Sequence, residues 1–193
     1  MIDARLQLAL DGGGLELPAE GTIAVFQPPR DSDLPGLDND RVQIIHDFKP
    51  DYDAWAARGY DVVRTIKDRY AACIVCLPRA KAEARAVIAA ACEVCDGIVV
   101  IDGQKTDGAD SVLREMRDRV TVQGPISKAH GKMFWISEPA AEFFADWRQG
   151  PELTEGGFWT APGVFSADGV DLASALLVDA LPEKLGSGVA DLG

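Results

Sequence analysis

The fold is decided by residues 73–101, which read CIVCLPRAKAEARAVIAAACEVCDGIVVI. The segment begins and ends with short, continuously apolar runs, 73–77 and 98–101, which predict strands buried on both faces. Between them, apolar residues recur every three or four positions, which predicts a helix that begins near Pro78. A strand, a helix and a strand with short connections are typical of a parallel sheet with crossover helices.

The neighbouring segments extend this pattern in both directions along the chain. Further strands are predicted at residues 22–26, 42–45, 120–122 and 132–136, and a second helix at residues 109–116. We therefore predict an α/β, Rossmann-like domain over residues 1–136, with a parallel-type sheet and flanking helices.

The alternation of predicted strands and helices ends at residue 136. A linker with a short amphipathic helix is predicted over residues 137–160. Residues 168–181 then predict a largely apolar helix that ends before Pro182. We expect Leu172, Leu176 and Leu177 on that helix to be packed rather than exposed, because they form most of its apolar surface.

The composition is that of an acidic globular protein. The chain has 193 residues, of which 47% are hydrophobic and 26% charged, and its formal net charge is −12. This charge argues against binding of nucleic acid through the overall field. The charge is uneven, however, because residues 58–132 hold 13 bases and 10 acids, a net charge of +3. That middle stretch predicts either solvated helix faces or an anion-binding surface.

The sequence holds no targeting or membrane segment that we recognise. No apolar run approaches the roughly 18 residues that a membrane span needs. The first ten residues lack a basic segment followed by a hydrophobic core. We expect a soluble, cytoplasmic protein with no membrane partner.

A specific motif lies near the C-terminus. Residues 162–181 read PGVFSADGVDLASALLVDAL, and residues 189–193 read VADLG. This string resembles the RsmC-type 16S rRNA guanine-N2 methyltransferases of the methyltransferase small domain group. The matching positions are Pro162, Gly163, Val164, Phe165, Ser166, Asp168, Gly169, Asp171, Ser174, Leu176, Leu177, Asp191 and Gly193.

The resemblance extends more thinly upstream. Family members carry a first domain that looks like a degenerate class I methyltransferase fold, with two short motifs. The corresponding positions here are Pro78, Arg79, Lys81, Glu83 and Ala84, then Gly103, Gln104 and Lys105. The resemblance implies a degenerate methyltransferase-like domain at 1–136, and a second domain, the beginning of a truncated catalytic domain that binds S-adenosylmethionine, at 161–193. Because residues 189–193 predict a strand that runs into a glycine turn, we expect the chain to be a fragment.

The resemblance also implies a function. The full-length enzyme would transfer a methyl group from S-adenosylmethionine to the exocyclic amine of a guanine in the rRNA of the small ribosomal subunit. The cofactor would lie against Asp191 and Gly193, with Phe165, Ser166 and Asp168 as flanking contacts. The residues of this chain would position substrate or support the chain's own C-terminal catalytic domain. The alternative is a stand-alone α/β binding or folding-support module without enzymatic activity.

No catalytic residue is predicted within the chain itself. The family holds the amine to be methylated with an N-P-P-F/Y loop, but the only asparagine here is Asn39, which precedes Asp40. Gln27-Pro28-Pro29 follows a strand but lacks the trailing aromatic residue, so we interpret it as an extended proline turn. We expect this chain alone to be inactive.

Four lysines are candidate contacts to RNA phosphates: Lys81, Lys105, Lys128 and Lys132. Lys81 and Lys105 each follow a predicted parallel strand, at the edge where open α/β sheets bind ligands. The alternative is that all four are ordinary solvated lysines.

The cysteines are spaced like a four-thiolate zinc site, as Cys73-x2-Cys76-x15-Cys92-x2-Cys95. Residues three apart in a strand point to opposite faces, however, and the second pair falls on the apolar side of a helix. We therefore predict four buried thiols and no bound metal.

Overall fold

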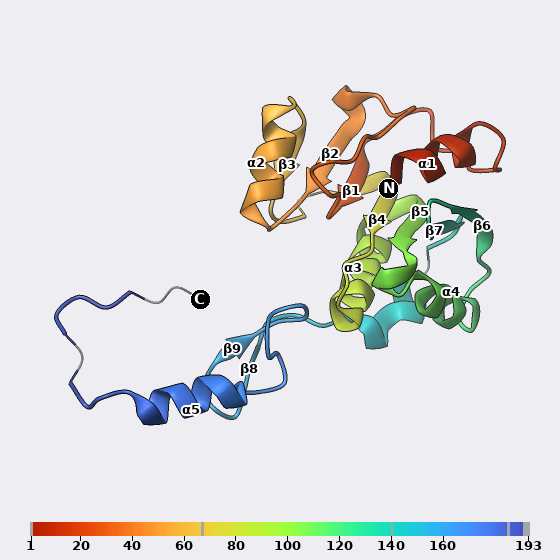
Figure 1. Cartoon of the computed structure of the whole chain (residues 1–193). Helices are drawn as coiled ribbons and strands as arrows, with labels where there is room; N and C mark the ends of the chain where they lie inside the picture. Colours follow the sequence, from red (N-terminus) through yellow and green to blue (C-terminus); the bar gives the residue numbers. More distant parts are fainter. Residues whose placement is uncertain (1, 67, 140, 185, 191–193) are drawn as a thin grey trace. The chain divides into compact units, whose positions relative to one another are not determined.

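The computed structural model describes residues 2–66, 68–139, 141–184 and 186–190 (Figure 1). The chain divides into two compact units, the first ending at Gln149 and the second beginning at Gly150. Each unit is described by itself below.

The first unit contains a seven-stranded sheet within the described residues. The strand order is β3-β2-β1-β4-β5-β7-β6. The strands are β1 (Ile23–Phe26), β2 (Val42–Ile45), β3 (Asp61–Val63), β4 (Tyr70–Cys76), β5 (Cys95–Gln104), β6 (Gln123–Lys128) and β7 (Gly131–Ile136). Strands β1 to β5 are parallel, and β7 runs antiparallel to both β5 and β6. The predicted α/β fold class is confirmed, with a mostly parallel rather than a wholly parallel sheet.

Helices cover both faces of this sheet (Figure 1). They are α1 (Ile2–Leu10), α2 (Lys49–Ala57), α3 (Lys81–Val94) and α4 (Ala109–Arg117), with 3-10 helices η1 (Asn39–Arg41), η2 (Lys105–Asp107) and η3 (Ala141–Trp147). α1 and α2 pack into one core, whereas α3, α4 and η3 pack into the other. Alternate residues of β5 serve the two cores, since Val99 belongs to one and Val100 to the other. This is why the continuously apolar runs predict the central strands correctly.

The structure differs from the prediction at the sheet edge. The expected strand at residues 120–122 is wrong, because Val120 closes the last turn of α4 through a hydrogen bond from its N–H to the carbonyl of Met116 (2.9 Å). Strand β6 begins at Gln123 instead. Helix α3 likewise begins at Lys81, three residues after Pro78, and Cys95 is the first residue of β5.

The 3-10 helix η3 packs into the first unit, although the sequence placed residues 137–160 in a linker. Phe144 and Trp147 are buried in the same core as α3. The guanidinium of Arg119 lies 4.8 Å from the centroid of the Trp147 ring, and that of Arg85 lies 5.6 Å away. These two cation–π contacts fasten η3 to α3 and to the end of α4.

The second unit contains a hairpin of β8 (Glu152–Leu153) and β9 (Trp159–Thr160), followed by α5 (Leu172–Ala180). α5 begins four residues later than predicted, because the Asp171 carboxylate caps it by accepting a hydrogen bond from the N–H of Ser174 (2.9 Å). The expected packing of its leucines is wrong within the described residues: Leu172, Leu176 and Leu177 are 75%, 60% and 62% exposed. The short hairpin is too small to cover a helix that is apolar around most of its circumference.

Among the described residues, none of the helices has the length and apolarity needed to cross a membrane.

Candidate functional site

The first unit has a topological switch point between β1 and β4, where open α/β sheets usually bind ligands beyond the carboxyl ends of the strands. Gln27 follows β1, has a positive φ of 53°, and donates a hydrogen bond from its side-chain amide to the Asp47 carboxylate (2.9 Å). The carbonyl of Pro28 accepts a hydrogen bond from the Trp55 indole (2.9 Å). Pro28 and Pro29 have no N–H to offer a ligand. The polar groups of this turn are thus largely satisfied by the protein itself.

Carboxylates also lie near this turn, on Asp47, Asp51 and Glu83. His46 is buried, and its ring Nδ1 accepts a hydrogen bond from the Phe48 N–H (3.3 Å). Burial lowers the pKa of His46, although the nearby Asp51 carboxylate opposes that shift. Burial, reinforced by the negative charge of Asp47, raises the pKa of Glu83 in the first turn of α3. The turn after β1 is therefore poorly suited to a phosphate.

A buried ion pair links α1 to the end of β5. Arg5 is 0% exposed and Asp102 is 4% exposed. The Arg5 guanidinium meets the Asp102 carboxylate through Nε–Oδ1 (2.5 Å) and Nη2–Oδ2 (2.8 Å). Burial raises the pKa of Asp102, whereas Arg5 acts to lower it. Burial alone would lower the pKa of Arg5, but the hydrogen bond and charge of Asp102 raise it overall.

The same guanidinium holds the hairpin between β6 and β7. Its Nη1 donates to the carbonyl of Lys128 (2.9 Å) and approaches that of Ala129 (3.5 Å). Gly131 leaves room for this contact, because a Cβ at that position would overlap the guanidinium and lie 2.6 Å from the Gly103 carbonyl oxygen. Arg5 therefore ties the hairpin turn to the end of β5.

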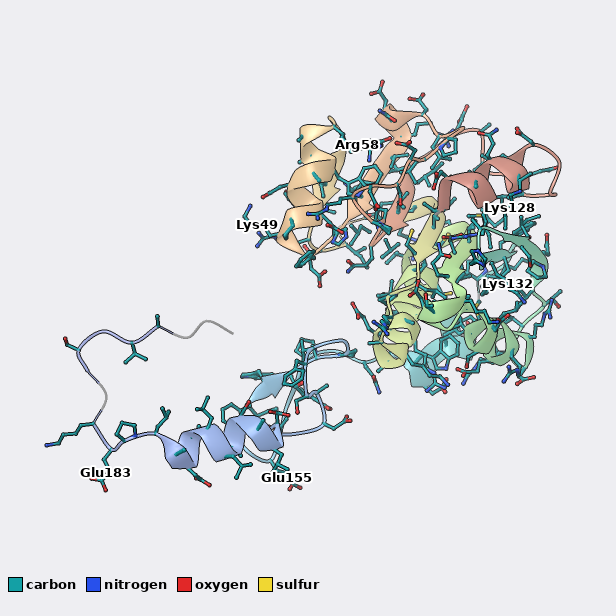
Figure 2. All side chains as sticks on the ribbon, viewed as in Figure 1. Lys49, Arg58, Lys128, Lys132, Glu155 and Glu183 are labelled. Carbon is teal, nitrogen blue, oxygen red and sulfur yellow. The ribbon has the colours of Figure 1, made fainter. Side chains whose placement is uncertain are left out.

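Three of the four predicted lysines surround one cavity beside this hairpin. The cavity has a volume of about 380 Å³ and is lined in part by Lys105, Lys128 and Lys132, which we call the lysine pocket. Figure 2 labels Lys128 and Lys132 in this region. Lys132 also pairs with Asp110 at the start of α4 (Nζ–Oδ1 2.6 Å). Lys81 is not part of this cavity and pairs instead with Glu115 on α4 (2.5 Å).

In the second unit, two of the predicted cofactor contacts line a cavity of about 740 Å³ between the β8–β9 hairpin and α5. They are Phe165, which is 82% exposed, and Ser166, whose hydroxyl donates to the Gly169 carbonyl (2.7 Å). Asp168 is not among the lining residues. Asp191 and Gly193 lie outside the described residues.

The four cysteines are buried free thiols, as predicted. Cys73, Cys92 and Cys95 lie in the core beneath α3, whereas Cys76 faces the opposite core. Burial raises the pKa of Cys92 to about 12. Within the described residues, no group of three or more histidine, cysteine or acidic side chains is placed to hold a metal ion.

Residues 155–193 match the family model of the methyltransferase small domain. The predicted methyltransferase resemblance is confirmed. The match includes the whole PGVFS motif and extends over Asp191 and Gly193. No curated protein sequence matches the chain significantly.

Solved structures extend the likeness to the first unit. The 16S rRNA N2 methyltransferase RsmC of T. thermophilus, solved with AdoMet and guanosine, aligns with a TM-score of 0.66 at 20% identity. The alignment covers 92% of this chain and 51% of RsmC, so the chain spans about half the length of that enzyme. A protein of Thermoplasma acidophilum aligns with a TM-score of 0.49 at 13% identity, covering 70% of this chain and 86% of that one. The likeness to RsmC shows that the chain has a Rossmann-like fold of the class I methyltransferase type.

Proposed function

We propose that this chain is the N-terminal part of a cytoplasmic, S-adenosylmethionine-dependent methyltransferase that modifies the exocyclic amine of a guanine in small-subunit rRNA. The observation that carries the proposal is the methyltransferase small domain match at residues 155–193, joined to a first unit whose fold resembles that of RsmC. Its partners would be small-subunit rRNA and the catalytic domain that continues beyond this chain.

In this proposal the second unit, beginning at Gly150, opens the catalytic domain. Phe165, Ser166 and Asp168 would hold the cofactor together with Asp191 and Gly193. The cavity beside Phe165 fits such a group, because an exposed aromatic ring and apolar walls suit a heteroaromatic ligand with a thioether chain. When bound, the cofactor would supply an electrophilic methyl group. Phe165 would orient it by ring contact, and Ser166 would fix the turn through its hydrogen bond to the Gly169 carbonyl.

The first unit would be non-catalytic and would position substrate or support the catalytic domain. Its turn after β1 supports this role. A nucleotide-type site needs free backbone N–H groups and an available acid, whereas here two prolines follow Gln27 and the Asp47 carboxylate already accepts the Gln27 amide.

The test compares residues 1–193 with the protein extended through its catalytic domain. The extended protein should bind S-adenosylmethionine by calorimetry and incorporate labelled methyl groups into small subunits that lack the modification. Residues 1–193 alone should do neither. Submillimolar cofactor binding by residues 1–193 would show that the first unit retains a working pocket, and no binding by either protein would favour the stand-alone module.

A pair of variants tests the cofactor contact within the extended protein. Phe165→Ala should weaken cofactor affinity at least tenfold. The control Phe143→Ala removes a half-exposed ring from η3 in the first unit and should leave the affinity unchanged. Equal affinities in the two variants would contradict the assignment of Phe165.

A further inference from the structure

The lysine pocket is a local concentration of positive charge on a protein whose net charge is −12. It brings together side chains from three places: Lys105 at the end of β5, and Lys128 and Lys132 on either side of the β6–β7 turn. Many other basic side chains of the described residues are matched by a carboxylate, as Lys49 is by Asp53. Neither Lys105 nor Lys128 has a carboxylate within ion-pair distance among the described residues.

One acid partly offsets this charge. Asp110 pairs with Lys132, and the hydrogen bond from Lys132 and the charge of Lys105 lower the pKa of its carboxyl. Three ammonium groups and one carboxylate leave a net charge of about +2 at neutral pH. Because α4 begins at Ala109, the positive end of its helix dipole faces the same cavity and adds to the field of the lysines.

The backbone around the lysine pocket is held by buried interactions. Ala129 and His130 form the turn with positive φ values of 48° and 55°, a conformation that residues other than glycine rarely adopt. Arg5 holds the turn through its hydrogen bond to the Lys128 carbonyl, and the Lys105 N–H donates a hydrogen bond to the His130 carbonyl (2.9 Å). Such a turn persists only when its surroundings determine it. The stems of the three lysines therefore start from fixed positions.

We propose that the lysine pocket binds a phosphodiester of an RNA backbone. Lysine ammonium groups contact phosphates as point charges, and the cavity of about 380 Å³ has room for a phosphate and part of its sugar. No aromatic ring other than the imidazole of His130 lines it among the described residues, so the site reads backbone charge rather than stacked bases. That this RNA is ribosomal rests on the proposed function. The assignment of a phosphodiester rests only on the pocket.

The test is binding of a fluorescently labelled RNA stem-loop to residues 1–193, measured by anisotropy across a series of KCl concentrations. The triple variant Lys105→Gln/Lys128→Gln/Lys132→Gln should bind at least tenfold more weakly than the wild type at low salt. Its slope of log K against log salt should be shallower by about 1, because one lost phosphate contact removes roughly 0.7 to 0.9 from the slope. The loss should be the same for stem-loops of different sequence.

The matched control is Lys49→Gln/Lys81→Gln/Arg148→Gln, which removes three cations that are already paired with carboxylates elsewhere on the first unit. It should bind RNA within threefold of the wild type. Equal losses in the two triple variants would overturn the proposal in favour of a diffuse charge effect. Complete displacement of RNA by 10 mM inorganic phosphate, at constant ionic strength, would overturn it in favour of a small-anion site. Circular dichroism and melting of both variants should match the wild type.

Failure of the proposed function would give a different result. In the extended protein, the pocket variant should keep its affinity for S-adenosylmethionine and require more ribosomal substrate for half-maximal methylation. If the wild type binds RNA through the lysine pocket but transfers no methyl group, the proposed function fails and the phosphodiester site stands. If the pocket variant binds RNA as well as the wild type while methylation proceeds, the phosphodiester site fails alone.

Discussion

The buried pair of Arg5 and Asp102 offers a quantitative test of how the first unit is held together. Arg5→Met keeps the aliphatic bulk of the side chain but removes its charge and its hydrogen bonds to Asp102 and to the Lys128 carbonyl. The Asp102 carboxylate would then be buried without a counter-charge. Breaking one side of a buried pair in this way costs about 3–5 kcal/mol of stability.

Removing both charges should cost less than removing one. In Arg5→Met/Asp102→Leu no uncompensated charge remains, and apolar replacements of buried pairs are often close to neutral.

Lower pH should reduce the loss of stability in the single variant Arg5→Met, because protonation removes the charge of Asp102. Because burial raises the pKa of Asp102, the folded state takes up a proton more readily than the unfolded state. The defect of Arg5→Met should therefore shrink as the pH falls through the folded pKa toward the unfolded value near 3.9.

The assay is urea unfolding followed by fluorescence of the buried Trp55 and Trp135, together with thermal melting. A loss of about 3–5 kcal/mol corresponds to a melting point lower by roughly 6–20 °C for a chain of this size. A loss below about 1 kcal/mol for Arg5→Met would refute the reasoning. The reasoning would also be refuted if the double variant lost as much free energy of unfolding as the two single variants lose in sum.

Other predictions follow from burial. His46→Gln should flatten the pH dependence of stability. In the wild type, the pKa of His46 is below 6.5 in the folded state, so stability should fall as the pH drops from 6.5 toward that folded value. Identical urea midpoints for both proteins from pH 7 to 5 would refute this. The four buried thiols, including Cys92, should resist iodoacetamide at pH 8 until denaturant is added, as mass spectrometry would show. Leu176→Ala should change the stability of residues 1–193 by less than about 0.5 kcal/mol, and a loss of 2 kcal/mol in urea unfolding would mean that α5 is packed. Gly131→Ala should cost roughly 1–3 kcal/mol by overlap with Arg5, whereas Gly150→Ala, which meets nothing within 4 Å, should be tolerated in the same assay.

The sequence predicts the centre of the fold better than its edges, for physical reasons. Strands β4 and β5 are buried on both faces, so every position is apolar and the signal is strong. Helix α1 is not predicted from apolar periodicity, because the charged Arg5 lies on its buried side. The partner of Arg5, Asp102, lies 97 residues away in the sequence. Helix α2 is not predicted either, because Trp55 is its only buried residue and leaves no apolar periodicity.

The candidate sites are also predicted only in part from the sequence. Lys105, Lys128 and Lys132 are separated in sequence, and only the antiparallel pairing of β5 with β7 brings Lys105 beside the hairpin. Lys81 resembles them in sequence, yet Glu115 on the neighbouring helix neutralises it. The PGVFS motif predicts the match to the methyltransferase small domain without the structure. The exposure of α5 is not predicted, because it depends on what the described residues of the second unit pack against that helix.

The packing of η3 bears on how this protein should be divided for recombinant work. A truncation that stops at residue 136 would remove Phe144 and Trp147, both buried, and uncover the apolar surface of α3 that they shield. It would also strip Arg85 and Arg119 of the indole between them. Fresh apolar surface of that kind favours aggregation. A cut after Gln149 preserves the shield, so the two truncations should differ sharply in expression yield and in light scattering, although only 13 residues separate them.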